Sequence, residues 1–348
     1  MSFRDLNERE WRILEAVVQS YVETAEPAGS RTLAKRFGLG LSPATIRNTL
    51  SDLEEKGYLY HPHTSAGRVP TDRAYRMYVD SLAQLAPLAV QERDRLIERI
   101  LAGGSAIETV LRCAAQSLGI LTQELGVALG PRLEETVLRR LELVRLSAER
   151  LLLVMTLEGG AMRTIFVEAP GSLADETIAE VTVVLNERLA GLTVREIRAS
   201  LADRLRDSVP ALGPARELLN IFVQEGDSVF DVPIGNESGN VVLGQASVLA
   251  EQPEFATGDS LRRLIELTET RDQLAELLRQ RRAKPGISIT IGNEHADPRF
   301  GNLTIVTAEY RAGPFGGVIG VIGPTRMPYE KVISLVSHTS RLVTDLLG

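Results

Sequence analysis

The sequence lacks the features that mark several classes of protein. Cys113 is its only cysteine, which excludes an internal disulfide and every zinc site built on paired cysteines. No apolar run approaches the roughly 18 uninterrupted residues that a membrane-spanning helix needs. The first ten residues, MSFRDLNERE, are charged and lack the apolar segment of a signal peptide. We therefore expect a cytoplasmic protein without a membrane partner.

Motifs of catalysis and cofactor binding are also missing. The sequence has no nucleophile elbow, no P-loop and no zincin helix, and the glycines between 313 and 323 do not fit the dinucleotide-binding spacing. His61 and His63 have no further cysteine, histidine or carboxylate at ligand spacing, so an interpretation without a metal is the simpler one. We expect no enzyme activity, no cofactor and no metal site.

The composition is that of a folded protein with more than one domain. At 348 residues, with 44% hydrophobic and 24% charged residues, the chain is long for a single core. A net charge of -7 argues against nonspecific coating of nucleic acid. Positive charge is nevertheless concentrated locally, because residues 27–51 contain four basic residues and no acidic one.

Two helices are predicted near the N-terminus. Residues 7–24 carry apolar side chains three and four positions apart, which is the pattern of one buried helical face. Ser30 is expected to cap a second helix that reaches Phe37, and Gly38 and Gly40 end it in a short turn.

A third helix is predicted to begin sharply at Pro43. Ser42 is a good N-cap, and proline fits the first helical position because no amide hydrogen is needed there. One face carries the apolar residues Ile46, Leu50 and Leu53. The opposite face is small and polar, with Ala44, Arg47, Asn48, Ser51 and Glu55. Gly57 closes the helix, and two short strands around a polar turn follow.

Three helices followed by a hairpin predict an N-terminal winged helix-turn-helix, whose third helix reads bases in double-stranded DNA. Arg47 suits the acceptors of guanine and Asn48 suits adenine, with Ala44 and Ser51 beside them. Contacts with the DNA backbone or through the wing are expected from Arg31, Lys35, Arg36, Ser42, Thr45, His63, Thr64, Ser65, Gly67 and Arg68. The alternative is a helical trio that packs against a partner, with Arg47 and Asn48 merely solvated.

Two stretches resemble a known family. The segments EPAGSRTLAKRFGLGLSPATIRNTL and HTSAGRVPTDRAYRMYVD are similar to the heat-inducible transcription repressors of the HrcA family, and residues 6–80 carry nearly all of the motif content. The resemblance implies a homodimer that binds an inverted-repeat operator and represses chaperone operons. It also implies that the GroEL chaperonin maintains the active repressor.

The remainder of the chain alternates between strand and helix patterns, so the expected fold class is multidomain α+β. Helices are expected over 71–85, 91–101, 105–126, 173–191 and 260–280, and after Pro328. Strands are expected over 137–146, 150–157, 162–167, 228–233 and 240–249, and in three runs from residue 287 onward. The resemblance implies a central GAF-like domain interrupted by an inserted dimerisation domain. The expected boundaries are 1–87 for the winged helix, 88–170 and 256–348 for the GAF-like halves, and 171–255 for the insertion.

Two interpretations of the central domain stay open. GAF folds often bind small molecules, which would make the protein a ligand-gated regulator. The other interpretation is a scaffold that sets the separation of two wings, and it needs no ligand. The sequence shows no polar cluster with obvious site spacing, which favours the scaffold.

Overall fold

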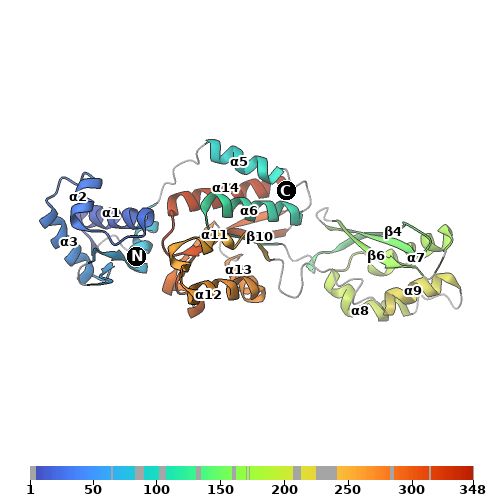
Figure 1. Cartoon of the computed structure of the whole chain (residues 1–348). Coiled ribbons are helices and arrows are strands. Elements are labelled where there is room, and N and C mark those ends of the chain that lie inside the picture. The colour runs from blue at the N-terminus through green and yellow to red at the C-terminus, as the bar shows by residue number, and fades with distance from the viewer. Residues whose placement is uncertain are drawn as a thin grey trace. The chain divides into compact units, whose positions relative to one another are not determined.

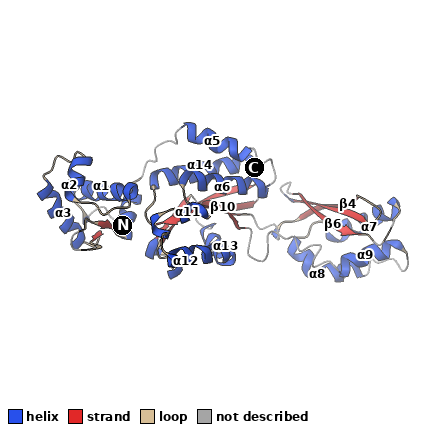
Figure 2. Ribbon diagram, viewed as in Figure 1, coloured by secondary structure: helices blue, strands red, loops and turns tan. Residues whose placement is uncertain are grey.

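The computed structural model describes residues 5–63, 66–82, 90–101, 107–130, 135–158, 162–169, 171, 173–206, 213–224, 241–282, 286–312 and 315–347. The chain mixes α-helices and β-strands and divides into two compact units (Figures 1 and 2). Unit 1 comprises Met1–Gly130, Val241–Tyr310 and Gly317–Gly348, and unit 2 comprises Pro131–Asn240 and Arg311–Gly316. Unit 2 is therefore an insertion into the sequence of unit 1.

The N-terminal region of unit 1 contains helices and a two-stranded antiparallel ladder in the expected order. These elements are α1 (Glu8–Thr24), α2 (Ser30–Arg36), α3 (Pro43–Glu55), β1 (Leu59–Tyr60), β2 (Val69–Pro70) and α4 (Asp72–Ser81). Asn7 and Glu10 form a reciprocal capping box at the start of α1. Ile13, Leu14, Leu33, Ile46 and Leu53 are completely buried, so the three helices share one apolar core.

The rest of unit 1 is built on a five-stranded sheet with the order β7-β3-β10-β9-β8. Its strands are β3 (Leu125–Leu129), β7 (Val241–Leu243), β8 (Ile287–Ile291), β9 (Leu303–Ala312) and β10 (Phe315–Pro324). The helical segments are α5 (Val90–Leu101), α6 (Ile107–Thr122), α11 (Ser247–Ala250), η4 (Pro253–Phe255), α12 (Gly258–Glu269), α13 (Arg271–Arg282), η5 (Gly292–Glu294), η6 (Pro298–Phe300) and α14 (Tyr329–Leu347).

Helices cover both faces of this sheet (Figure 1). Leu125, Val127 and Leu129 of β3 join a core with Leu274 and Leu278 of α13. The opposite face of β3 lies directly against α6. A Cβ atom on Gly126 would lie 1.8 Å from the carbonyl oxygen of Ala115, so only glycine permits this close approach.

Within unit 1, α4 contacts the turn that follows β8. The amide of Asn293 donates to Asp72 Oδ2 at 2.9 Å. Arg76 pairs with Glu294, with Nε 2.6 Å from Oε1, and also donates to the carbonyl oxygen of Ile289 at 2.9 Å. A Cβ atom on Gly292 would collide with the Asp72 carboxylate, and Gly292 has a positive φ of 49°. Glycine is required there on both grounds.

Unit 2 is a three-stranded antiparallel sheet covered on one face by helices (Figure 2). Its elements are β4 (Leu138–Arg145), β5 (Arg150–Leu157), β6 (Met162–Glu168), α7 (Asp175–Leu189), α8 (Val194–Arg206) and α9 (Pro214–Gln224). The Asn186 amide donates to the Leu141 carbonyl at 2.7 Å and accepts from the Leu141 amide at 2.8 Å. This exchange fixes α7 against β4.

The observed boundaries differ from those expected from the sequence. The strands over 138–168, expected in the first GAF-like half (88–170), belong to unit 2 because their inner face packs against α7, α8 and α9. Residues 241–255, expected in the insertion (171–255), belong to unit 1 because β7 pairs with β3. The N-terminal region is part of unit 1, and its expected boundary at residue 87 stays a prediction.

Several elements also differ from the expected ones. The helix expected over 105–126 ends at Thr122, and β3, which the sequence patterns did not predict, follows it. The single helix expected over 260–280 is two helices that meet at Thr270. The strand expected over 228–233 lies outside the described residues.

Candidate nucleic-acid interface

Local capping and packing fix the start and the orientation of α3. The Ser42 hydroxyl accepts from the Thr45 amide at 3.1 Å, and Pro43 follows it at the first turn, as the sequence predicted. Ile46, Leu50 and Leu53 are buried, and Thr49 is buried beside them. The Thr49 hydroxyl donates to the Thr45 carbonyl at 3.2 Å, which satisfies it inside the helix. The opposite face of α3 must therefore point outward.

A buried end of α1 holds the C-terminal end of α3. Lys56, which follows α3, places its Nζ atom 2.8 Å from Glu10 Oε2. The hydrogen bond from Lys56 holds the pKa of the Glu10 carboxyl below its ordinary value. This contact anchors the end of α3 to α1 and so fixes the orientation of the outer face of α3.

The outer face of α3 has the small, polar character expected of a surface that reads bases. Ala44, Arg47 and Asn48 are exposed, and Ser51 is half-buried. The Ser51 hydroxyl donates to the Arg47 carbonyl at 3.3 Å, so its lone pairs remain the part available to another molecule. In the described part of the structure no ion pair is recorded for Arg47. Its guanidinium is presented to solvent.

The cations of α2 fall into two groups. Arg31 and Lys35 are exposed, and no carboxylate partner is recorded for them within the described ranges. Arg36 forms an ion pair with Glu23 and lies over the Phe37 ring, 5.6 Å from its centroid. Arg36 is therefore less available for an external contact than the sequence suggested.

Ser30 does not cap α2, contrary to expectation. It is the first helical residue and is buried, and Gly29 occupies the N-cap position without a side-chain hydrogen bond. The expected glycine turn after α2 is present, since Gly38 and Gly40 have positive φ angles of 55° and 67°.

The hairpin after α3 is short and packed at its base. Leu59 pairs with Pro70 and Tyr60 pairs with Val69, and His63 near its tip is exposed. Thr64 and Ser65 lie outside the described residues.

Gly67 is a close-packing residue at the base of this hairpin. A Cβ atom there would lie 2.5 Å from the carbonyl oxygens of Pro27 and Ala28. Arg68 exchanges two backbone hydrogen bonds with Ala28, of 2.8 and 2.9 Å. Any larger residue than glycine would push the hairpin away from this segment.

Arg68 is placed differently from the exposed phosphate contact that the sequence predicted. Its side chain is only 12% exposed, and its NH2 atom lies 2.7 Å from Glu54 Oε2. The other oxygen of Glu54, Oε1, lies 2.8 Å from His61 Nδ1. The sequence did not predict a role for Glu54, because no local pattern indicates that a carboxylate of α3 pairs with residues of the hairpin.

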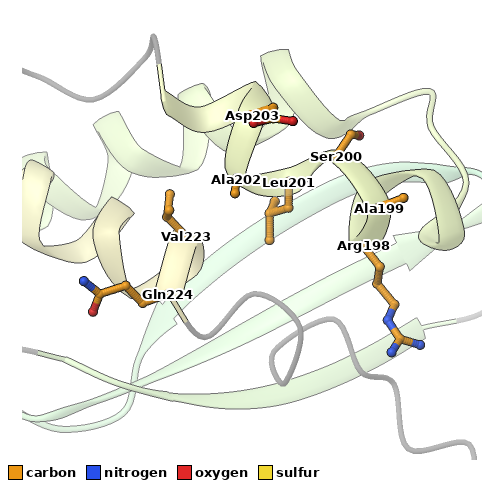
Figure 3. A pocket seen from close by; sticks show the side chains of 8 residues that line it. All are labelled: Arg198, Ala199, Ser200, Leu201, Ala202, Asp203, Val223 and Gln224. Atoms are coloured by element: carbon orange, nitrogen blue, oxygen red, sulfur yellow. The ribbon is translucent and has the colours of Figure 1, made fainter.

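Two hollows of the described structure differ in their lining. One, of about 180 Å³, lies between α8 and the end of α9 and is lined by backbone and mixed side chains (Figure 3). The other, of about 730 Å³, is lined by α5, the end of α6 and the start of α14, mostly through charged and polar side chains that include the paired residues Glu92 and Lys331. Among the described residues, no group of three or more metal-ligating side chains is found and no helix could cross a membrane.

Comparisons with known proteins identify the family. A family model described as the HrcA protein C terminal domain matches residues 108–333. The chain belongs to the HrcA family. The heat-inducible transcription repressor HrcA of Chlorobium phaeobacteroides (strain BS1) is 39% identical to it over 359 residues, covering 100% of both chains. That of Geobacter sulfurreducens is 38% identical over 345 residues, covering 99% of this chain and 98% of the relative.

A solved structure shares the fold of the whole chain. The crystal structure of a hypothetical protein, determined at 2.2 Å resolution, matches with a TM-score of 0.74 at 20% identity and covers 99% of each chain. Membership of HrcA confirms the resemblance carried by the two N-terminal segments. Both relatives are named as heat-inducible transcription repressors, which agrees with a binding surface around α3 rather than a catalytic site.

Proposed function

We propose that the chain is a sequence-specific DNA-binding repressor of heat-shock chaperone operons, whose N-terminal region is a winged helix-turn-helix. The observation that carries the proposal is the outer face of α3. Arg47 and Asn48 are exposed on a helix whose opposite face is buried. An α-helix fits the major groove of B-DNA, where each base pair presents a distinct pattern of donors and acceptors.

The proposed base contacts follow from the chemistry of the two exposed side chains. Arg47 donates two hydrogen bonds to O6 and N7 of guanine, and Asn48 pairs with N6 and N7 of adenine. Ala44 and Ser51 flank them and are small enough to let the helix approach the bases. Contacts that position the protein on the duplex come from Arg31, Lys35, Arg36, Ser42, Thr45, His63, Thr64, Ser65, Gly67 and Arg68.

The cationic side chains proposed to contact the DNA backbone differ in how available they are for a phosphate. Arg31 and Lys35 can reach a phosphate directly, because they are exposed. Arg36 would have to share its guanidinium with Glu23, and Arg68 with Glu54. The support for the first two is therefore stronger.

We further propose that the active repressor is a homodimer on an inverted-repeat operator. The outer face of the unit 2 sheet supports this, because Val144, Leu152 and Phe166 lie opposite one another across β4, β5 and β6. Phe166 is 72% exposed and Val144 is 43% exposed. A second copy of the same face would remove this apolar row from water.

The proposal also includes a chaperone partner and a location in the cell. Family membership supports a chaperonin dependence in which GroEL maintains the active repressor in the cytoplasm. The scaffold interpretation of unit 1, with a GAF-like fold, is preferred to the ligand-gated alternative, because Glu92 and Lys331 at the larger hollow pair with each other.

A selection of bound duplexes from a random pool tests the central proposal. The purified full-length chain should enrich a sequence with two inverted half-sites, since a two-fold symmetric dimer reads two-fold symmetric DNA. Enrichment of no sequence, or of one unrepeated half-site, would contradict specific binding or dimeric binding respectively. Adding GroEL should raise the fraction of chain that binds the enriched duplex.

A further inference from the structure

Glu54 connects both sides of the hairpin to α3. His61 directly follows β1 and places Nδ1 2.8 Å from Glu54 Oε1. Arg68 directly precedes β2 and places NH2 2.7 Å from Glu54 Oε2. Because an ionised carboxylate only accepts hydrogen bonds, both atoms act as donors. One carboxylate on the helix therefore ties together both ends of the segment that forms the hairpin tip.

The hairpin needs such support. Its two strands have two residues each, and an isolated two-stranded hairpin is marginal in water. Its base is held by buried Leu59 and Val69 and by the pair of backbone hydrogen bonds between Arg68 and Ala28. Glu54 adds side-chain contacts from α3, the helix with which a wing must be aligned, to the two residues beyond this base, on the side of the tip.

We propose that Glu54 is a positioning residue for DNA binding, which holds the wing at a fixed angle to α3 through Arg68 and His61. This inference rests on the proposed function. A carboxylate near a DNA-binding surface repels phosphates, so Coulomb's law alone predicts that its removal strengthens binding. The positioning role predicts the opposite sign.

The competing account is that Glu54 merely withholds Arg68 from a phosphate. Removing Glu54 would then release the guanidinium and raise the affinity. The sign of the effect therefore separates the two accounts.

Glu55 provides a matched control. It is the next residue of α3, it is exposed, and no ion pair is recorded for it among the described residues. Glu55→Ala removes the same charge from the same helix without touching the hairpin.

The test compares operator affinities of the full-length chain and its variants at several salt concentrations. Glu54→Ala should weaken binding on the order of tenfold, whereas Glu55→Ala, which removes a carboxylate from the outer face of α3 itself, should strengthen it slightly. The salt dependence should also become shallower in Glu54→Ala, because wing contacts with phosphates are lost although the protein has become more positive. Glu54→Gln, which keeps the shape and one acceptor, should recover part of the affinity.

Controls separate positioning from unfolding. Stoichiometric titration gives the active fraction, and a partly unfolded variant lowers this fraction without changing the salt dependence of the remainder. In an Arg68→Ala background, Glu54→Ala should have much less further effect, because the two act through one contact. Binding by Glu54→Ala as tight as by Glu55→Ala overturns the inference. A wild-type chain that prefers no sequence over random duplex overturns the proposed function instead.

Discussion

Two outward faces of the molecule are built in the same way and differ in chemistry. The outer face of α3 and the outer face of the β4–β5–β6 sheet each lie opposite a fully buried apolar face. The first presents Arg47 and Asn48, and the second presents Val144, Leu152 and Phe166. The apolar face gains from contact with any well-fitting surface that excludes water, whereas the polar face gains only where its donors meet acceptors.

This difference assigns different tasks to the two faces. Hydrogen bonds to base edges discriminate between sequences, and cations on phosphates make binding sensitive to salt. Removal of an apolar row from water is insensitive to sequence and only weakly affected by salt. The comparison therefore predicts that salt and substitutions of charged residues change DNA binding by the α3 face, whereas dimerisation through the sheet face responds to substitutions in its apolar row.

The largest expected effect comes from the apolar face. Phe166→Asp places a charge in the row and should convert the dimer into a monomer, because the charge cannot be buried without a partner. Operator affinity should fall by about 100-fold or more, since two linked half-sites then become independent ones. Analytical ultracentrifugation and a binding titration measure the two effects.

Val183→Asp is the matched control for this substitution. Val183 is an apolar residue of α7 in the same unit and is 56% exposed, but it does not belong to the sheet. Val183→Asp should leave both the oligomeric state and the operator affinity unchanged. A dimeric Phe166→Asp protein would show that another surface joins the two copies.

The next effect concerns the polar face. Arg47→Ala should cost about 1–3 kcal/mol on the preferred operator and relax the preference at one base pair per half-site. Arg12→Ala removes an exposed arginine from α1 and should change neither. Binding to an array of singly substituted operators measures the preference. Equal losses on specific and random duplexes would argue against base reading by Arg47.

A smaller effect should distinguish the faces by their salt dependence. Lys35→Ala should reduce the slope of log operator affinity against log salt by about 2 for the dimer, because one phosphate contact is lost in each of the two half-sites. The dimer dissociation constant should stay unchanged over the same range of salt. Lys331→Ala removes one lysine charge from α14 and serves as the control. A dimer that dissociates as salt rises would contradict the apolar interface.

Local signals made α3 and its exposed residues predictable. Ser42 and Pro43 specify its start, and the spacing of Ile46, Leu50 and Leu53 specifies its buried side, so the exposed side follows from geometry. The pairing of Arg68 with Glu54 depends on the return of the hairpin, which no local pattern encodes.

The fold was less predictable where helix patterns continued into strands. The apolar pattern of α6 continues into β3, and Gln123, with a positive φ of 61°, changes the direction of the chain without the glycine that usually marks such a position. The assignment of strands 138–168 to unit 2 depends on which helices cover them. That is a long-range property, and the sequence patterns did not determine it.

The smallest effect on either face should come from Glu124, a carboxyl group in the core of unit 1 that belongs to neither face. Glu124 is 2% exposed, and burial raises the pKa of its carboxyl well above the ordinary value. The folded chain therefore holds this proton more tightly than the unfolded chain, so stability falls as pH rises above the unfolded pKa.

Glu124→Gln keeps the shape and the contact with Gln252, whose Nε2 lies 3.2 Å from Glu124 Oε2. It should flatten this part of the pH profile and raise the melting temperature at neutral pH by about 2–4 °C for each kcal/mol gained. Operator affinity and dimerisation should not change, and a loss of either would show that the core of unit 1 communicates with the two faces.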